Sequence, residues 1–541
     1  MKRKMVLLLC AVLCIGLIAC GKKQAPAGKQ EEKEEGKEKQ PLLELELPLA
    51  EEKAELSVWT FYENSYVEDL NTVPGVMEME KQTNVHINWN TVTIQEMTEK
   101  FGLLLASGEY PDIIYNAAYP GGNEKAVAEG IYLELTDLME FYMPNYKGII
   151  TADDKLLKDV ITDDGRVIGI YGVNCNDEGP AQENEWSGLT IRKDWLDDLG
   201  LSMPETIEEW HEVLVAFKEQ KGATAPLTTG KNGYVKMGAF MSAYDVFPGY
   251  YLDGDTVKYG PLEDGYREWV QLFRDWYAEG LIDPDFTAND FDWMADPTVS
   301  ATGKAGAFTN LYSFTEDILF QYGYTQEEKI SVKPVANPVL NKGETPKSLG
   351  VTSGLAGNPI FVSTQCKNPE LAVQWLDYQF TEDGMRLNFY GVQDQSYTIT
   401  EDGSYAFTDL IMQNPDGHTP SDALGLYARG NGLGMYNWEA QNRTQVGAER
   451  FIANQEVWNA QDFSQVYPQN ASLTEEEGNT YNSLYTNVET MVNENTVQFI
   501  IGAKAMEEYD SFLEKLKSFG AEECLAVKQA AYDRYQNRSL K

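Results

Sequence analysis

Histidine, cysteine and positive charge are all scarce in this chain. Its 541 residues include three histidines, six cysteines and 43 Lys and Arg residues against 85 Asp and Glu residues, so the formal net charge is −42. A nucleic-acid-binding surface is not expected, because it requires clustered Lys and Arg to release counterions from phosphates. An acidic ligand is disfavoured rather than excluded, since a few local arginines can override the overall field.

Motifs of known catalytic chemistry are also missing. His86, His211 and His418 stand at widely separated positions and form no ligand pair, so neither a histidine base nor a histidine-held metal is expected. There is no GxSxG, HExxH, P-loop or paired CxxC motif. The 85 acids could supply a glycosidase pair, but no local sequence isolates one in an apolar niche that would raise its pKa. We therefore predict a protein that is not an enzyme.

The one long apolar run stands at the N-terminus and is too short to span a bilayer. It covers residues 6–18, follows the sequence KRK, and falls short of the ~20 residues that a spanning helix needs. Residues 1–19 are interpreted as an export signal. The run ends in LIACG, which resembles the lipobox of bacterial lipoproteins, so Cys20 is expected to carry the lipid and residues 20–55 to form a disordered tether.

The rest of the chain has the size and composition of a folded protein with more than one domain. Its hydrophobic fraction is 43% and its aromatic fraction 12%, and at about 150 residues per domain the length predicts two to four domains. Only Cys175, Cys366 and Cys524 remain there, and such widely spaced thiols form no disulfide framework. Burial of apolar side chains must therefore supply the stability.

Short extended runs separated by helical stretches predict a parallel α/β sheet. The runs are Leu56–Thr60, Val85–Trp89 and Asp112–Tyr115. Later helices are predicted from capping boxes at Thr206 and Thr474, from an aromatic stripe that begins at Tyr266, and from Asn368-Pro369. Residues 402–469 are rich in Asn, Gly and Gln and are predicted to be mostly loop.

Aromatic rings and amides follow two of the extended runs. The first run continues as WTFYEN and the third ends in Tyr115-Asn116. Ligands bind at the carboxyl ends of parallel strands, and a sugar offers an apolar face to a ring and hydroxyls to amides and phenols. The pattern favours a carbohydrate site, although core packing remains the better explanation for each ring taken singly.

Eight motifs in a fixed order resemble the large substrate-binding lipoproteins of bacterial carbohydrate ABC importers, distant relatives of maltose-binding protein. The resemblance extends from Leu56 to Asn537 and rests on LASGEYPDIIY, GIYLELTDL, DGRVIGI, GLTIRKDWLDDLGLSMPETIEEW, EGLIDPDF, GKAGAF, KNPELAVQWLDYQFTEDGMRLNFYGV and AAYDRY. It implies an α/β type II periplasmic-binding-protein fold, in which two α/β lobes are joined by a hinge that the chain crosses more than once, with a ligand cleft between them.

The resemblance also implies how the chain is divided. The expected parts are the signal peptide 1–19, the lipidated tether 20–55, lobe 1 at 56–173, the hinge crossing and lobe 2 at 174–353, a return to lobe 1 at 354–390, and 391–541 as the remainder of lobe 2 with C-terminal helices packing across both lobes. Ligand-binding residues are expected at Trp59, Phe61, Tyr62, Asn64, Tyr115, Asn116, Trp186, Tyr244, Asn310, Tyr312, Tyr390, Tyr436 and Trp438.

Two segments bear on metal binding. NCNDEGPAQENE, from Asn174 to Glu185, has the spacing of a calcium loop, but an uncharged first residue and Pro180 in a carbonyl position disfavour it. We interpret it as a loop that crosses between the lobes. Many members of the family carry a calcium loop before the strand that contains PLT here, whereas this chain has only KGATA, so no structural calcium or other cofactor is expected.

The predicted function is capture of an extracellular oligosaccharide or glycoside and its delivery to permease subunits. The protein is expected to be a monomer, held on the outer face of the cytoplasmic membrane through Cys20. Alternatives from the sequence are a surface glycoside-acting enzyme, a ligand receptor for a sensor kinase, and a peptide-binding transport protein. The 31 Tyr and 11 Trp residues favour sugar over peptide.

Overall fold

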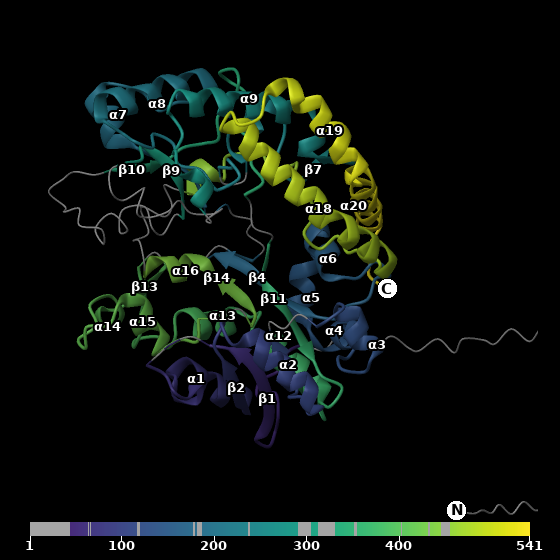
Figure 1. Ribbon diagram of the computed structural model, residues 1–541. Helices are drawn as coiled ribbons and strands as arrows, with labels where there is room; N and C mark the ends of the chain where they lie inside the picture. The colour runs from purple at the N-terminus through teal and green to yellow at the C-terminus, as the bar shows by residue number, and fades with distance from the viewer. Residues whose placement is uncertain are drawn as a thin grey trace, which may run out of the picture. The chain divides into compact units, whose positions relative to one another are not determined.

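The computed structural model shows two α/β lobes, each built around its own sheet (Figure 1). The structure describes residues 44–541 except 63, 65, 116–118, 177–178, 181–184, 186, 236–237, 290–303, 312–330, 351–353, 402, 431–432 and 445–454. All of them belong to one compact unit, Leu42–Lys541. Cys20, the proposed signal and residues 20–43 of the proposed tether lie outside the described residues. Residues 44–55 are not a tether as predicted, because Leu45 and Leu49 pack on the core of lobe 1 and the first strand begins at Ala54.

Lobe 1 contains a sheet with strand order β14-β4-β11-β3-β1-β2, to which β5 is added beside β4. Its strands are β1 (Ala54–Phe61), β2 (Val85–Val92), β3 (Ile113–Tyr115), β4 (Ile170–Asn176), β5 (Gly179–Pro180), β11 (Leu355–Val362) and β14 (Met435–Asn437). β1 is parallel to β2 and β3, as the three extended runs predicted. β11 is antiparallel to β3 and β4, and β14 is parallel to β4. All strands except β11 and β5 therefore run in the same direction.

Apolar clusters cover both faces of this sheet. On one face Val58 and Ile113 pack with α4, α5 and α12, and on the other Trp59 and Ile114 pack with Phe101 of α2. This follows from the alternation of strand side chains. The helices of lobe 1 are η1 (Leu70–Thr72), α1 (Pro74–Thr83), α2 (Met97–Ser107), α3 (Asn123–Ala128), α4 (Thr136–Tyr142), α5 (Pro144–Thr151), α6 (Asp154–Val160), α12 (Pro369–Tyr378), α13 (Glu382–Phe389), α14 (Asp409–Met412), α15 (Pro420–Gly425) and α16 (Trp438–Arg443).

Residues 391–443 differ from the expected division, which placed them with lobe 2. β14 pairs with β4 in the lobe 1 sheet, and the hairpin β12 (Tyr397–Ile399) and β13 (Tyr405–Phe407) packs on the same core. Residues 402–469, which were predicted to be mostly loop, are less irregular than expected, because they contain β13, α14, α15, β14 and α16. Lobe 1 is therefore assembled from two separate lengths of chain, the first ending at β5 and the second running from β11 to α16.

Lobe 2 contains the sheet β10-β6-β9 and a second apolar core. Its strands are β6 (Ser187–Arg192), β7 (Tyr250–Asp253), β8 (Thr256–Tyr259), β9 (Ala307–Leu311) and β10 (Val332–Pro334). Its helices are α7 (Lys193–Leu199), α8 (Ile207–Lys221), η3 (Ser242–Tyr244), η4 (Gly260–Leu262), α9 (Asp264–Ala278), η5 (Phe286–Ala288), α18 (Glu475–Ile500), η8 (Met506–Glu508), α19 (Tyr509–Ser518) and α20 (Ala521–Gln536).

The predicted helix starts are confirmed. Thr206 and Thr474 each accept a hydrogen bond from the backbone three residues on, and the glutamate there bonds back, which completes both capping boxes. Asn368 caps α12 through Leu371 N–H. The aromatic stripe from Tyr266 lies on α9, where five of its side chains are buried in the lobe 2 core.

The C-terminal helices contact both lobes. α20 packs beside α18, as Figure 1 shows, and near β8 of lobe 2. At its end, Tyr535 donates to Asp159 of α6 at 3.0 Å, and Arg534 pairs with Asp163 at 2.8 Å. The C-terminal helix α20 is thus bonded to lobe 1.

Candidate functional site

The candidate site is the edge of the lobe 1 sheet where its co-directional strands end. β1 ends at Phe61, β3 at Tyr115 and β14 at Asn437, and all three strands point the same way. Loops at this edge carry the side chains that follow each strand, so residues far apart in sequence are brought together. Five of the predicted aromatic residues lie at this edge. Phe61, Tyr62, Tyr436 and Trp438 are half-buried, whereas Tyr115 is only 3% exposed and packs in the lobe 1 core beneath them.

Rings from β1 and β3 form the first part of the edge. Phe61 stacks on Tyr115 with 5.8 Å between ring centroids. Tyr62 is half-buried and donates its hydroxyl to Gly425 O at 3.1 Å. Burial raises the pKa of Tyr62 and of Tyr115 to about 12, and the nearby Arg429 charge acts in the opposite direction on both. Both phenols are therefore neutral at physiological pH and serve as hydrogen-bonding groups rather than bases.

Asn64 shapes the loop after β1. Its side-chain oxygen accepts from Tyr66 N–H at 2.9 Å, and its nitrogen donates to Asp422 O at 3.4 Å. The first bond lies within the loop, and the second holds the loop against α15. The amide of Asn64 is thus engaged by the protein itself.

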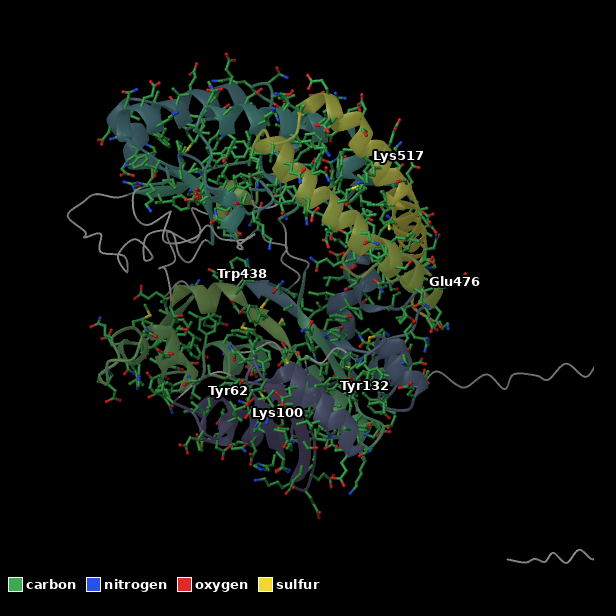
Figure 2. All side chains as sticks on the ribbon, viewed as in Figure 1. Tyr62, Lys100, Tyr132, Trp438, Glu476 and Lys517 are labelled. Atoms are coloured by element: carbon green, nitrogen blue, oxygen red, sulfur yellow. The ribbon has the colours of Figure 1, made fainter. Side chains whose placement is uncertain are left out.

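Tyr436 and Trp438 form the second part of the edge, at the end of β14. Tyr436 is half-buried and meets Phe389 edge-on, with 5.1 Å between centroids. Trp438 is half-buried and begins α16 in lobe 1, where Figure 2 labels it. It packs against Trp458, whose indole N–H donates to Leu189 O in β6 at 3.2 Å. Trp438 therefore adjoins a ring that is anchored on the lobe 2 sheet.

Trp59 and Tyr390 do not lie at this edge. Trp59 is 5% exposed and packs on Phe101, with 5.7 Å between centroids, on the sheet face that α2 covers. Tyr390 is fully buried among Tyr397, Tyr405 and Phe407. Their predicted contact with a ligand is corrected to a role in the core. The sequence misled because a ring near a strand end looks the same whichever face it points to.

The remaining predicted residues belong to lobe 2 or lie outside the described residues. Tyr244 is half-buried against the lobe 2 core, and burial raises its pKa to about 12. Asn310 stands in β9 opposite Gly188 of β6, and its side chain is not described. Asn116, Trp186 and Tyr312 lie outside the described residues.

The loop between β4 and β6 ends in a buried carboxylate. Glu185 is 2% exposed, and its two oxygens accept from Ser348 Oγ at 2.9 Å and Gln461 Nε2 at 2.8 Å. Asn174, the first residue of the calcium-like spacing, donates to Leu355 O at 3.0 Å. These two residues therefore face different partners. In the described part of the chain, no group of three or more His, Cys, Asp or Glu side chains has a metal-binding arrangement.

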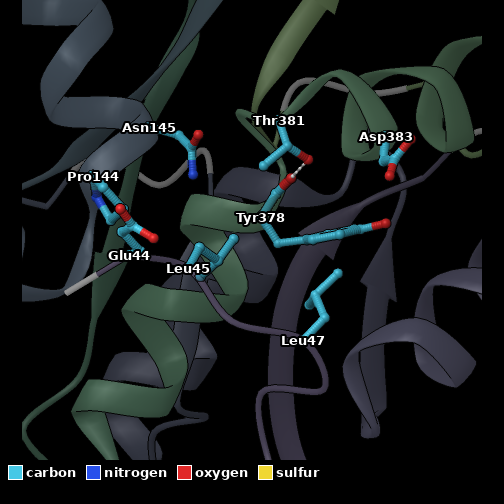
Figure 3. A pocket seen from close by; sticks show the side chains of 8 residues that line it. All are labelled: Glu44, Leu45, Leu47, Pro144, Asn145, Tyr378, Thr381 and Asp383. Atoms are coloured by element: carbon cyan, nitrogen blue, oxygen red, sulfur yellow. Dashed lines mark hydrogen bonds between the residues drawn. The ribbon is translucent and has the colours of Figure 1, made fainter.

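A separate pocket of about 280 Å³ lies away from the sheet edge (Figure 3). It is formed where residues 44–47 pass the start of α5 and the end of α12, and Thr381 donates to Tyr378 O across one wall at 2.7 Å. Its lining is Glu44, Leu45, Leu47, Pro144, Asn145, Tyr378, Thr381 and Asp383. None of the residues predicted to bind a ligand lines it.

Arg429 lies beside this edge but was not among the predicted site residues. This side chain is 4% exposed and lies close enough to Tyr62 and Tyr115 for its charge to affect both phenols. It sits in the stretch that was predicted to be mostly loop, between two residues with no distinctive motif. No local signal shows that such an arginine is buried, because its burial depends on α13 and β2.

The model of the bacterial extracellular solute-binding protein family matches residues 67–386, which is more than half of the chain. The chain belongs to this family. Two relatives are similar over most of their length: the fructooligosaccharide ABC transporter substrate-binding protein FusA of Streptococcus pneumoniae (24% identical, 98% of each chain) and lipoprotein LipO of Bacillus subtilis (26% identical, 84% of this chain and 87% of LipO).

Solved structures of solute-binding proteins share the fold. The alginate-binding protein AlgQ2 matches with a TM-score of 0.63 at 22% identity, covering 90% of this chain and 99% of its own. A solute-binding protein of Bifidobacterium longum infantis, associated with an HMO-binding ABC transporter, matches with a TM-score of 0.68 at 18% identity, covering 89% and 99%. The type II fold with two α/β lobes is thereby confirmed. No helix in the described part of this solute-binding protein has the length and apolar character needed to cross a membrane.

Proposed function

We propose that this solute-binding protein captures an extracellular oligosaccharide or glycoside and delivers it to the permease of an ABC importer. The observation that carries the proposal is the row of rings at one sheet edge: Phe61, Tyr62, Tyr436 and Trp438, all half-buried. A pyranose or furanose ring stacks its apolar face on such side chains and leaves its hydroxyls to phenols and amides. The name of FusA, a fructooligosaccharide-binding relative, supports the same ligand class.

Capture is coupled to closure of the two lobes. Trp438 begins a lobe 1 helix and adjoins Trp458, which is bonded to the lobe 2 strand β6. A ligand held at this place contacts both lobes only when they approach each other, and it shifts a hinge equilibrium by that difference in contacts. The closed form is the one presented to the permease subunits.

Binding without chemistry is the proposed mode of action. The phenols at the edge stay protonated at neutral pH, since burial raises the pKa of Tyr62 and Tyr115 to about 12. Such groups donate and accept hydrogen bonds but do not act as bases near pH 7. The protein therefore releases its ligand unchanged. It acts as a monomer, and a lipid on Cys20 holds it at the outer face of the membrane.

The decisive experiment is calorimetric titration of the lipid-free protein, residues 21–541, with a glycan panel that includes kestose. For the best ligand, Tyr436→Ala and Trp438→Ala are each expected to weaken binding by about 1–3 kcal/mol, because a stacking ring is lost. Phe519→Ala is the control, since this exposed ring lies just beyond α19 in lobe 2. The proposal fails if no glycan binds, if both variants bind as the unmodified protein does, or if the glycan is cleaved during incubation.

A further inference from the structure

Arg429 is a buried cation without a carboxylate partner among the described residues. Its side chain is 4% exposed. Nε and Nη2 donate to Asn388 Oδ1 at 3.3 and 3.0 Å, and Nη2 also reaches Gln379 Oε1 at 3.4 Å. Both acceptors are neutral amides. In the described part of the chain, other arginines form ion pairs with carboxylates, but Arg429 forms none.

One end of the guanidinium has nothing to bond. Nη1 is buried and has no hydrogen-bond acceptor, while Asn388 occupies the side formed by Nε and Nη2. Burial lowers the pKa of Arg429 to about 10, so the group still carries its charge at neutral pH. An uncompensated buried charge is costly, and proteins generally pair it or let it meet an ion.

A second unsatisfied donor lies beside it. Arg429 stands over the ring of Trp89 at 5.7 Å from its centroid, and the buried indole Nε1 of Trp89 has no acceptor either. Trp89 belongs to β2, the neighbour of β1. Two orphaned donors from different elements therefore lie together, which indicates a missing acceptor rather than one strained side chain.

Arg429 lies near the edge that carries the proposed solute site, whereas Trp89 lies within the sheet, opposite Val58 of β1. The charge of Arg429 opposes the rise in pKa of both Tyr62, which follows β1, and Tyr115, which ends β3. The protein as a whole repels anions, with a net charge of −42. A local positive centre at the edge offsets that repulsion where a ligand would bind.

We propose that Arg429 is a specificity residue for charge, and that the solute is a glycan bearing a carboxylate, such as a hexuronic acid unit. The carboxylate accepts from Nη1, while the half-buried Tyr62 phenol faces an adjoining hydroxyl. Arginine suits this role because its planar donors match a carboxylate. A water molecule would satisfy the hydrogen bonds but would leave the charge uncompensated. This inference rests on the proposed carbohydrate-binding function.

The test compares acidic oligosaccharides with their neutral counterparts of the same linkage, for example trigalacturonate with galactotriose, by calorimetry on residues 21–541. The unmodified protein is expected to bind at least one acidic member at least tenfold more tightly than its neutral counterpart. Arg429→Met is expected to abolish that preference, and Arg429→Lys to retain part of it. Arg386→Met is the matched control, because Arg386 lies on the same helix as Asn388 but pairs with Asp383.

Thermal unfolding of each variant separates binding from folding. Replacing a buried charge by a methionine is often tolerated, so Arg429→Met is expected to keep a cooperative transition. If it does not, Arg429→Lys and the preference of the unmodified protein decide the matter. Equal affinity for acidic and neutral glycans, or an acid preference that survives Arg429→Met, overturns the inference while the carbohydrate-binding function stands. If no glycan binds at all, both fall.

Discussion

At the scale of single residues, Asp377 shows what burial does to a carboxylate. It is fully buried on α12, and its oxygens accept from Asn145 Nδ2 at 2.7 Å and from Tyr146 N–H at 2.8 Å, at the start of α5. Desolvation raises its pKa from 3.8 to about 6, although these hydrogen bonds act in the opposite direction. The folded protein therefore holds this proton more tightly than the unfolded chain does.

The raised pKa of Asp377 makes the free energy of unfolding depend on pH. Since the folded pKa of Asp377 lies above the unfolded value, its contribution to stability is complete below pH 4 and is lost as the pH rises to about 6. We expect up to ~3 kcal/mol of such loss, from about two pKa units. Urea titrations at several pH values should show the loss in the unmodified protein and its absence in Asp377→Asn. Superimposable pH profiles of the two proteins would refute this account.

At the scale of elements, the buried side chain of Arg538, just after α20, holds the C-terminal segment against lobe 1. The Arg538 guanidinium is 2% exposed, pairs with Asp163 at 2.7 Å, and donates to Lys158 O at 2.7 Å and Ser472 Oγ at 2.7 Å. One side chain thus joins the C-terminal segment to the end of α6 in lobe 1. Exposed ion pairs contribute little by comparison, because water and salt screen them.

Arg538→Ala is therefore expected to lower the free energy of unfolding by about 2–4 kcal/mol, since it removes a buried side chain together with its bonds to three partly buried acceptors. The control is Arg267→Ala, which removes an ion pair with Asp510 whose side chains are 44% and 76% exposed. That variant should change stability by less than about 1 kcal/mol. Chemical denaturation of both proteins measures the difference. Similar losses in the two would show that burial of Arg538 is not what matters.

At the scale of the whole molecule, Glu185 joins three passages of the chain. Its carboxylate bonds Ser348 and Gln461, its N–H donates to Asn459 Oδ1 at 2.8 Å, and its carbonyl accepts from Gln455 at 3.2 Å. Glu185 lies just before β6, Ser348 lies before β11, and the other partners lie after α16, where the chain passes between the lobes. The crossing segments are thus tied at one point.

Replacing Glu185 should lower the free energy of unfolding of the whole protein. Glu185→Ala is expected to cost about 2–4 kcal/mol of unfolding free energy, because Ser348 and Gln461 lose buried acceptors. Glu185→Gln should cost less, since one acceptor oxygen remains. Glu456→Ala is the control, being exposed in the same crossing segment. A Glu185→Ala protein within about 0.5 kcal/mol of the unmodified one, the usual range for surface substitutions, would contradict the expectation.

Local patterns were sufficient for the elements. The strands at Leu56, Val85 and Asp112, both capping boxes and the α9 stripe follow from alternation, caps and helical period, which depend on neighbouring residues only. The row of candidate rings after β1 also followed from sequence, because ligands bind where parallel strands end.

Only the tertiary structure decided which of these rings lie at the sheet edge and what lies beside them. Trp59 and Tyr62 are three residues apart, yet one is sealed under α2 and the other reaches the sheet edge. β14 joins β4 across more than 250 residues of sequence, and Arg429 is buried because α13 and β2 surround it. The sequence by itself determined which segments are strands and helices and how each begins, since those are short-range choices. Which strands pair, which face a side chain points to and which side chains are buried all depend on long-range contacts that no local pattern contains.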